Sequence, residues 1–287
     1  MTSYLMITGA TGGLGSALAI ECASRGMDLY LTDLRPDGAA FAQALIQEFG
    51  IQAHYYPCDL TSPDSRSALV SALQAEQAQF WGLFNVAGTD YEGEFLERQR
   101  AQVLTILRLN IEATVDMTQA ILQLRDRERR FMLLNVCSLA AITPMPYKAI
   151  YAASKRFLLD FSLALREEIK PFGSVTALCP AGMPTTTETV ASIFAQGFWG
   201  KATTFTAEEV ARQAISAALQ EKAVVIPGII NQALQRLSAM VPPTIAAQVA
   251  GKRWKEVRQR RRFIWKPNRQ PLAGDVQELI TDQSRCA

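Results

Sequence analysis

The chain has 287 residues, of which 49% are hydrophobic and 20% are charged, and its formal net charge is +2. This composition is typical of a globular protein with a sizeable core, and the charge balance argues against a protein that binds polyanions over its whole surface. No apolar run approaches the roughly 18 residues of a membrane span, so we expect a cytoplasmic protein that can still touch a membrane surface.

Histidine and cysteine are too few and too scattered for the common metal and triad sites. His54 is the only histidine, which disfavours a histidine metal cluster and a Ser-His-Asp triad, and we expect no metal. The five cysteines form no CxxC pair and mostly lie in apolar stretches, which favours buried thiols in a reducing compartment.

Short apolar runs alternate with helical patterns along most of the chain. Because a strand, a glycine loop, a helix and a second strand follow one another within about thirty residues, the pattern predicts an α/β fold with a parallel sheet. The predicted strands are 4–8, 28–33, 53–56, 80–85, 131–136, 175–179 and 223–226. The predicted helices include 39–49, one that starts at 62–63, a long one within 94–124, 152–169, and one from 206 to about 220.

Two stretches depart from this alternation. Residues 182–205 form a long insertion, and insertions of this length in compact domains are typical of lids or binding loops. From residue 228 the sequence predicts a helix over 228–241, a break at Pro242 and Pro243, and a helix over 244–262. We therefore expect a catalytic domain over 1–227, a helical extension over 228–265, and a loosely ordered polar tail over 266–287.

A glycine-rich loop follows the first strand and points to a nucleotide. Gly9, Gly13 and Gly15 let the backbone turn tightly and approach a pyrophosphate, and the next helix offers its free N–H groups. Asp33 ends the second strand, where a carboxylate accepts hydrogen bonds from ribose hydroxyls and repels a 2′-phosphate. This favours NAD, although the nearby Arg35 weakens the preference and NADP stays possible. Asp59 could receive the adenine amino group or cap a helix.

The stretch 133–155 carries the candidate chemistry. Tyr151 and Lys155 lie four residues apart and so share a helix face. A nearby ammonium favours tyrosinate, and we expect it to lower the pKa of Tyr151 so that this residue becomes a usable general acid or base. Ser138 follows a buried strand, and its hydroxyl could hydrogen-bond a substrate oxygen. Each residue alone also fits a solvated pair or a helix cap; their occurrence together, in order, favours catalysis.

These residues resemble the motifs of the short-chain dehydrogenase/reductase family. The matching positions are Thr8-Gly9-x-x-x-Gly13-x-Gly15, Asp59, Asn85-Val86-Ala87-Gly88, Asn110, Ser138, Tyr151-x-x-x-Lys155, and Pro180 with Gly182. The resemblance implies a single Rossmann-type domain, which is a doubly wound parallel sheet. It also implies Tyr151 as proton donor or acceptor, Ser138 as carbonyl orienter and Lys155 as ribose binder, with Asn110 bending its helix and holding a relay water.

The glycine loop and the resemblance together suggest a set of cofactor-binding residues. These are Gly9, Thr11, Gly13, Leu14, Gly15, Asp33, Asp59, Leu60, Asn85, Ala87, Gly88, Tyr151, Lys155, Pro180, Gly182 and Thr185. The chain departs from the family pattern twice: Val86 stands where a second Asn is usual, and Ala181 separates Pro180 from Gly182. The second departure bears on whether Thr185 reaches the nicotinamide amide.

An apolar group of residues is expected on the substrate side. The predicted substrate residues are Ser138, Leu139, Met145, Tyr151, Met183 and Phe198. Such a pocket should take a hydrophobic alcohol or ketone, such as a steroid, a 3-oxoacyl group or an aryl ketone. The aromatic residues of the insertion could instead pack it onto the body.

Basic residues crowd the last predicted helix, between Lys252 and Arg262. A basic amphipathic helix over 244–265 could make peripheral membrane contact, or could pack on the body with a solvated basic face. We expect no nucleic-acid partner. The long helices within 94–124 and 152–169 resemble the pair that forms the dimer in the family, which implies a homo-oligomer, although the C-terminal extension could block that surface. The main hypothesis is an NAD-dependent oxidoreductase that transfers a hydride between nicotinamide and a secondary alcohol or ketone. The alternative is a nicotinamide-sensing scaffold that docks to a membrane or an acidic partner through the basic helix.

Overall fold

The computed structural model describes residues 2–184 and 203–264. A seven-stranded sheet forms its centre, in the order β3-β2-β1-β4-β5-β6-β7 with every pair parallel. The strands are β1 (Ser3–Thr8), β2 (Leu29–Asp33), β3 (Ala53–Pro57), β4 (Gln79–Asn85), β5 (Phe131–Val136), β6 (Gly173–Leu178) and β7 (Val224–Val225). The strand order reverses between β1 and β4, which is where open α/β sheets bind their ligands. The predicted doubly wound parallel sheet is confirmed.

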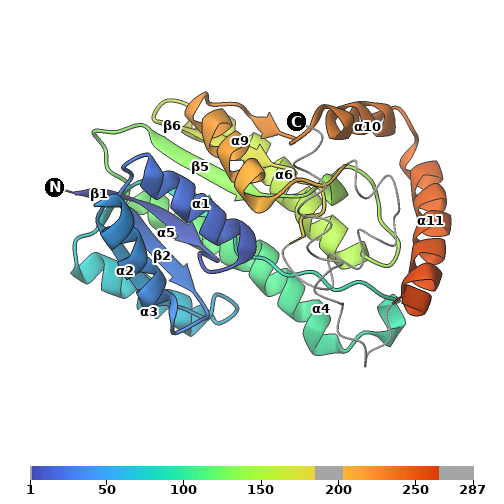
Figure 1. Cartoon of the computed structure of the whole chain (residues 1–287), viewed down its shortest axis with the longest axis horizontal. Helices are drawn as coiled ribbons and strands as arrows, with labels where there is room; N and C mark the ends of the chain where they lie inside the picture. Colours follow the sequence, from blue (N-terminus) through green and yellow to red (C-terminus); the bar gives the residue numbers. More distant parts are fainter. Residues whose placement is uncertain (1, 185–202, 265–287) are drawn as a thin grey trace.

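Helices cover both faces of the sheet (Figure 1). They are α1 (Gly13–Ser24), α2 (Gly38–Phe49), α3 (Pro63–Ala75), α4 (Arg100–Leu107), α5 (Ala113–Gln123), α6 (Ala149–Ile169), α9 (Ala207–Leu219), α10 (Ile229–Ala239) and α11 (Pro243–Ile264). Leu5 and Ile7 of β1 pack with α1, α2 and α9, whereas Met6 between them packs with α3 and α5. Because side chains alternate along a strand, one fully buried strand supplies both halves of the core.

The predicted long helix within 94–124 is interrupted. A short 3-10 turn, Phe95–Glu97, precedes α4, and a π-helical turn, Arg108–Glu112, separates α4 from α5. The π turn contains Asn110, in agreement with the expected bend there; such turns often mark functional positions. Helix α6 begins three residues before the predicted start. Helix α9 begins with a capping box between Thr206 and Glu209.

The C-terminal helices α10 and α11 lie beyond the sheet layers, at one side of the domain (Figure 1). Both predicted helices are present, and Pro243 starts the second one instead of lying in the break. No helix in the described ranges is long and apolar enough to cross a membrane. Most of the predicted lid, including Thr185 and Phe198, and the predicted tail 266–287 lie outside the described residues.

Candidate active site

The glycine loop is packed so closely that side chains could not replace Gly9 and Gly15. Gly9 has a φ of +67°, and a Cβ atom on it would lie 2.7 Å from the Cα of Ala87. A Cβ on Gly15 would lie 1.9 Å from the carbonyl oxygen of Gly9. The Thr8 hydroxyl accepts hydrogen bonds from the backbone N–H groups of Val86 (3.1 Å) and Ala87 (3.3 Å), which joins the ends of β1 and β4. This contact uses only the backbone of Val86, so the missing Asn does not disrupt it.

The loop offers polar groups that suit a dinucleotide. The carboxylate of Asp33 accepts hydrogen bonds from the backbone N–H groups of Thr11 (3.0 Å) and Leu34 (2.7 Å), which places it beside the glycine loop. The Thr11 hydroxyl is buried and has no hydrogen-bond partner among the described residues. A buried hydroxyl at the start of α1 fits a pyrophosphate oxygen, because it otherwise lacks a partner. Leu14 instead buries its side chain in the core.

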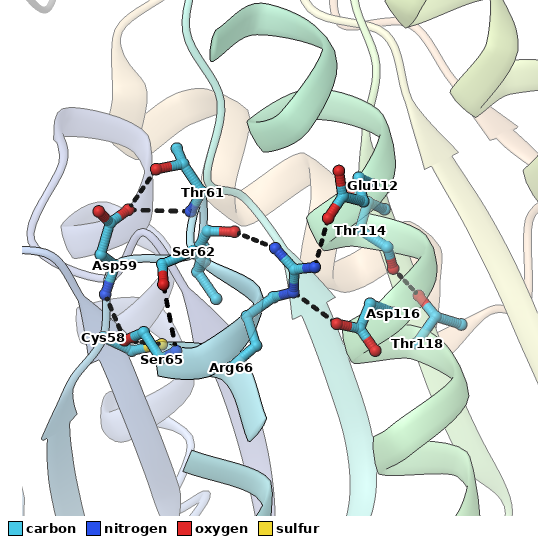
Figure 2. A network of polar contacts seen from close by, with 11 residues as sticks. Cys58, Asp59, Thr61, Ser62, Ser65, Arg66, Glu112, Thr114, Asp116 and Thr118 are labelled. Atoms are coloured by element: carbon cyan, nitrogen blue, oxygen red, sulfur yellow. Dashed lines mark hydrogen bonds and ion pairs between the residues drawn. The ribbon is translucent and has the colours of Figure 1, made fainter. Parts of the chain in front are cut away.

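The loop after β3 shows how Asp59 and Leu60 are used (Figure 2). One carboxylate oxygen of Asp59 accepts from the backbone N–H (2.9 Å) and the hydroxyl (2.7 Å) of Thr61. The cap of α3 is Ser62, whose hydroxyl accepts from Ser65 N–H, so Asp59 is a turn residue and not the helix cap. Its second carboxylate oxygen bonds nothing among the described residues, which leaves it available to an adenine amino group.

A buried arginine that the sequence did not single out joins this loop to the π turn. Figure 2 shows the Arg66 guanidinium between Glu112 (2.6 Å) and Asp116 (2.5 Å). A third N–H donates to the carbonyl of Leu60 (2.7 Å), and Arg66 itself is only 3% exposed. The helix pattern gives no signal for this contact, because its partners lie 46 and 50 residues away in sequence.

Asn110 is fully engaged with protein groups. Its amide donates to the carbonyl of Thr89 (3.0 Å) and to the hydroxyl of Ser154 (3.0 Å), and its carbonyl accepts from Thr89 N–H (2.9 Å). A Cβ on Gly88 would lie 3.3 Å from both the Asn110 oxygen and the Lys155 ammonium. In this arrangement the Asn110 side chain positions the loop after β4 against α6 and uses both of its N–H groups, and its role in holding a relay water stays a prediction.

Ser138, Tyr151 and Lys155 converge at the carboxyl end of β5. The Lys155 ammonium is buried, donates to the carbonyl of Val136 (2.7 Å) and lies 5.8 Å from the centre of the Tyr151 ring. The Ser138 hydroxyl accepts from Ala140 N–H (3.1 Å) and lies close enough to Tyr151 to lower the pKa of its phenol. Residues separated along the chain thus meet in one site that offers a hydroxyl, a phenol and an ammonium. Together these groups can bind and protonate a carbonyl oxygen.

The pKa of Tyr151 shifts in the direction opposite to our expectation. Burial and then the charge of Asp90 raise the pKa of Tyr151, while the hydrogen bond from Ser138 lowers it. Burial also lowers the pKa of Lys155, which weakens the ammonium as a counter-charge. The sequence could not reveal Asp90 here, since it comes from a loop about sixty residues upstream.

A second lysine next to the site was also missed. Lys148 forms ion pairs with Asp90 and with Glu92 (3.8 Å). Its ammonium lies 5.6 Å from the ring centre of Tyr151 and 5.5 Å from that of Trp254 in α11. The C-terminal extension therefore reaches the surroundings of Tyr151.

The pocket beside Tyr151 has a different lining from the one predicted. It is bounded by the loop after β4, by α4 and by the start of α6, and it is mainly apolar and aromatic. Its residues are Tyr91, Gly93, Phe95, Arg98, Gln102, Val103, Ile106, Tyr147, Ala149, Ile150 and Tyr151. Arg98 contributes a cation to this lining. Its buried Nε has no hydrogen-bond partner among the described residues.

Several predicted residues lie near this site without lining the pocket. Leu139 donates its backbone N–H to the carbonyl of Pro180 (2.9 Å), Met145 lies in the turn before α6, and Met183 packs on the core near α9. Asn85 donates its side-chain amide to Thr118 and Asn135 inside the sheet, so only its backbone could face a cofactor. Gly182 is exposed.

The buried thiols agree with the expected pattern. Cys22, Cys58, Cys137 and Cys179 are buried and free. The described residues contain no group of three His, Cys, Asp or Glu side chains that could hold a metal ion.

Known relatives match about 60% of the chain. One is a very-long-chain 3-oxoacyl-CoA reductase from Laccaria bicolor, with 26% identity over 58% of this chain and 51% of the relative. Another is estradiol 17-beta-dehydrogenase 11 from Mus musculus, with 27% identity over 61% of this chain and 60% of the relative. The chain thus spans about half the length of the first of these relatives.

Solved structures match more of the fold. A short-chain dehydrogenase from Sphingobium yanoikuyae in complex with NADPH is 25% identical, has a TM-score of 0.67, and aligns over 84% of this chain and 96% of its own. A Burkholderia phymatum short-chain dehydrogenase/reductase in complex with NAD has a TM-score of 0.70 at 21% identity, over 82% of this chain and 92% of its own. Residues 3–196 match the family model described as short chain dehydrogenase. By this match, and by the motif residues that meet at the carboxyl edge of its sheet, the chain belongs to the short-chain dehydrogenase/reductase family.

Proposed function

We propose that this protein is an NAD(P)-dependent oxidoreductase that interconverts a secondary alcohol and a ketone. The observation that carries the proposal is the convergence of Ser138, Tyr151 and Lys155 beside a glycine loop with an unpartnered Thr11 hydroxyl. The alternative of a nicotinamide-sensing scaffold has less support, because the complete set of candidate catalytic groups is assembled.

Each residue has a definite part in the proposed reaction. The nicotinamide, when bound, supplies or accepts the hydride. The Ser138 hydroxyl holds the substrate oxygen, and the Tyr151 hydroxyl donates a proton to that oxygen during ketone reduction. Lys155 places its positive charge behind the phenol and is available to ribose hydroxyls. Because burial raises the pKa of Tyr151, the phenol is protonated at neutral pH and can serve as the proton donor in ketone reduction.

For the cofactor, Asp33 supports NAD as the first choice. Its carboxylate lies beside the glycine loop, where it would accept hydrogen bonds from the ribose hydroxyls and repel a 2′-phosphate. NADP stays the second choice, since solved relatives are complexes with NADPH as well as with NAD. We keep Thr185, which lies outside the described residues, as a proposed contact to the nicotinamide amide.

The substrate is proposed to be hydrophobic. Phe95, Val103 and Ile106 line the pocket with Tyr151, and the names of the relatives include 3-oxoacyl-CoA and estradiol activities. Arg98 adds a cation that could receive an acidic group at one end of such a molecule. Leu139, Met145, Met183 and Phe198 are retained as further proposed contacts on the side of the insertion.

We also propose a homo-oligomer formed through α4 and α6. Leu107, Phe157 and Leu163 are large apolar residues exposed on these two helices, and Phe157 stacks on Phe161 at 6.0 Å. Exposed aromatic and aliphatic side chains on adjacent helices fit an interface between copies. The cytoplasmic location and the domain limits at residues 227 and 265 remain proposals drawn from the sequence.

A Tyr151→Phe variant tests the proposal. We expect turnover to fall by a factor of about 100 to 10,000 over a panel of steroid, acyl and aryl ketones, because the proton donor is lost. Binding of NADH, followed by its fluorescence, should stay close to that of the wild type. Unchanged turnover would contradict the assignment, and absence of NADH and NADPH binding in the wild-type protein would exclude the cofactor.

A further inference from the structure

Helix α10 turns its polar side toward the protein. Asn231 is fully buried, and its amide donates to the carbonyls of Thr203 (3.0 Å) and Pro227 (2.8 Å). Gln235 and Ser238 follow at helical spacing and are half-buried. A surface helix of a globular protein normally buries its apolar side, so this orientation is reversed.

The opposite side of α10 is apolar and faces outward. We call it, together with the first turns of α11, the apolar face; it comprises Ile229, Ile230, Leu234, Leu237, Met240, Val241, Ile245 and Val249, all exposed. The positions 230, 234, 237 and 241 repeat every three or four residues and so form one stripe. Leu237 is 63% exposed and Met240 83% exposed, and a contiguous group of this kind marks an interaction surface.

Positive charge follows the apolar face directly. Between residues 229 and 264 the sequence has eight Lys or Arg residues and one Glu, although the whole chain has a net charge of only +2. Lys252, Arg253 and Lys255 are exposed within the second half of this stretch, which we call the basic segment, 252–262. Apolar residues that enter an interface, with Lys and Arg beside them, match an anionic lipid surface in both polarity and charge.

Helix α11 is held against the domain near the active site. Its Val257 is buried, Trp254 lies over the Lys148 ammonium, and Gly251 lies next to Pro146. The apolar face is therefore carried on an anchored helix pair, and this pair adjoins the loop that leads into Tyr151.

We propose that the apolar face and the basic segment dock the protein peripherally on an anionic lipid bilayer, with α10 lying along the interface. The occupant of the apolar face is thus the lipid surface. The inference goes beyond the proposed oxidoreductase activity and does not depend on it.

Vesicle cosedimentation of the full-length protein tests this surface. We expect binding to vesicles of phosphatidylcholine and phosphatidylglycerol in equal parts, and little binding to phosphatidylcholine alone. The double variant Leu234→Glu with Leu237→Glu should weaken binding by about tenfold or more, because both side chains leave the interface. Lys252→Glu with Arg253→Glu should also weaken it by about tenfold, and added salt should have a similar effect.

A matched variant tests whether vesicle binding depends on the apolar face or on any exposed leucine. Leu219→Glu changes an exposed leucine of α9, outside the apolar face, and should leave vesicle binding unchanged. All changed side chains are exposed, so thermal unfolding should confirm that each variant is folded.

Four results would overturn the proposal. The first is absence of binding to anionic vesicles by the wild type. The second is unchanged binding by the α10 double variant. A third is a wild-type oligomer that does not bind vesicles and is dissociated by the same variant, which would make the apolar face an interface between copies. The last is binding that occurs only after deletion of 265–287, which would make the protein's own C-terminal segment the occupant.

Discussion

The carboxyl edge of the sheet and the C-terminal helix pair arrange polar and apolar groups in opposite ways. At the sheet edge, polar side chains are buried and paired: Asn85 donates to Asn135, which donates to Ser162, and Lys155 donates to Val136. On α10 the apolar side chains are outside, and Leu237 touches solvent. Burying paired polar groups fixes one arrangement of a site, whereas leaving apolar groups exposed requires an external surface to cover them.

The two regions meet at Lys148. This residue pairs with Asp90 beside Tyr151 and lies under Trp254 of α11. The two regions are therefore neighbours in space: the site around Tyr151 adjoins an apolar surface that we expect to be covered by lipid.

A leucine-to-alanine substitution should give the largest difference in unfolding free energy between the two regions. Leu133→Ala in β5 should lower the free energy of unfolding by about 3 kcal/mol, because it leaves a cavity in a fully buried core. Leu237→Ala in α10 should change it by less than about 0.5 kcal/mol, since that side chain is exposed. Urea unfolding measures both. Comparable losses would show that α10 buries Leu237 in solution.

A second contrast compares two ion pairs. Arg66→Met should cost about 2 kcal/mol of unfolding free energy, because it removes a buried guanidinium that bonds Leu60 and two carboxylates. The carboxylates are about half exposed, so the loss stays below that of a fully buried pair.

The matched control is Arg156→Met, which breaks an exposed pair with Asp160 on α6. Its expected cost is below about 0.5 kcal/mol. If both variants lost the same unfolding free energy, the network drawn in Figure 2 would stabilise the fold no more than an exposed ion pair does.

The smallest effects should appear in the pH dependence of alcohol oxidation, which needs the Tyr151 phenolate. Asp90 raises the pKa of Tyr151, so Asp90→Asn should lower that pKa and move the oxidation profile to lower pH by about one unit. Lys148→Met removes the cation that pairs with Asp90 and should move the profile to higher pH by about half a unit.

Lys170→Met serves as the control for these profiles. It changes an exposed lysine paired with Glu167, and it should leave the pH dependence unchanged. Shifts of Asp90→Asn and Lys148→Met in the same direction would contradict opposing charges at Tyr151.

Much of the site could be predicted from local sequence. The glycine spacing, the Tyr151–Lys155 spacing and the alternation of strands and helices are properties of neighbouring residues, and each was found where the pattern indicated. The bend at Asn110 followed only from the family resemblance, and the π turn contains that residue. The lining of the pocket beside Tyr151 could not be predicted, because it combines the loop after β4 with the start of α6.

The sequence by itself determined the parallel α/β fold, the glycine loop and the placing of Tyr151 and Lys155 on one helix face, because backbone freedom and helical periodicity act over a few residues. Only the tertiary structure decided the charge environment of Tyr151, in which Asp90 raises the pKa from a distant loop. It also decided which side of α10 faces out. Periodicity shows that a helix has an apolar side, but the buried Asn231, bonded to Thr203 and Pro227, determines that this side faces away from the protein.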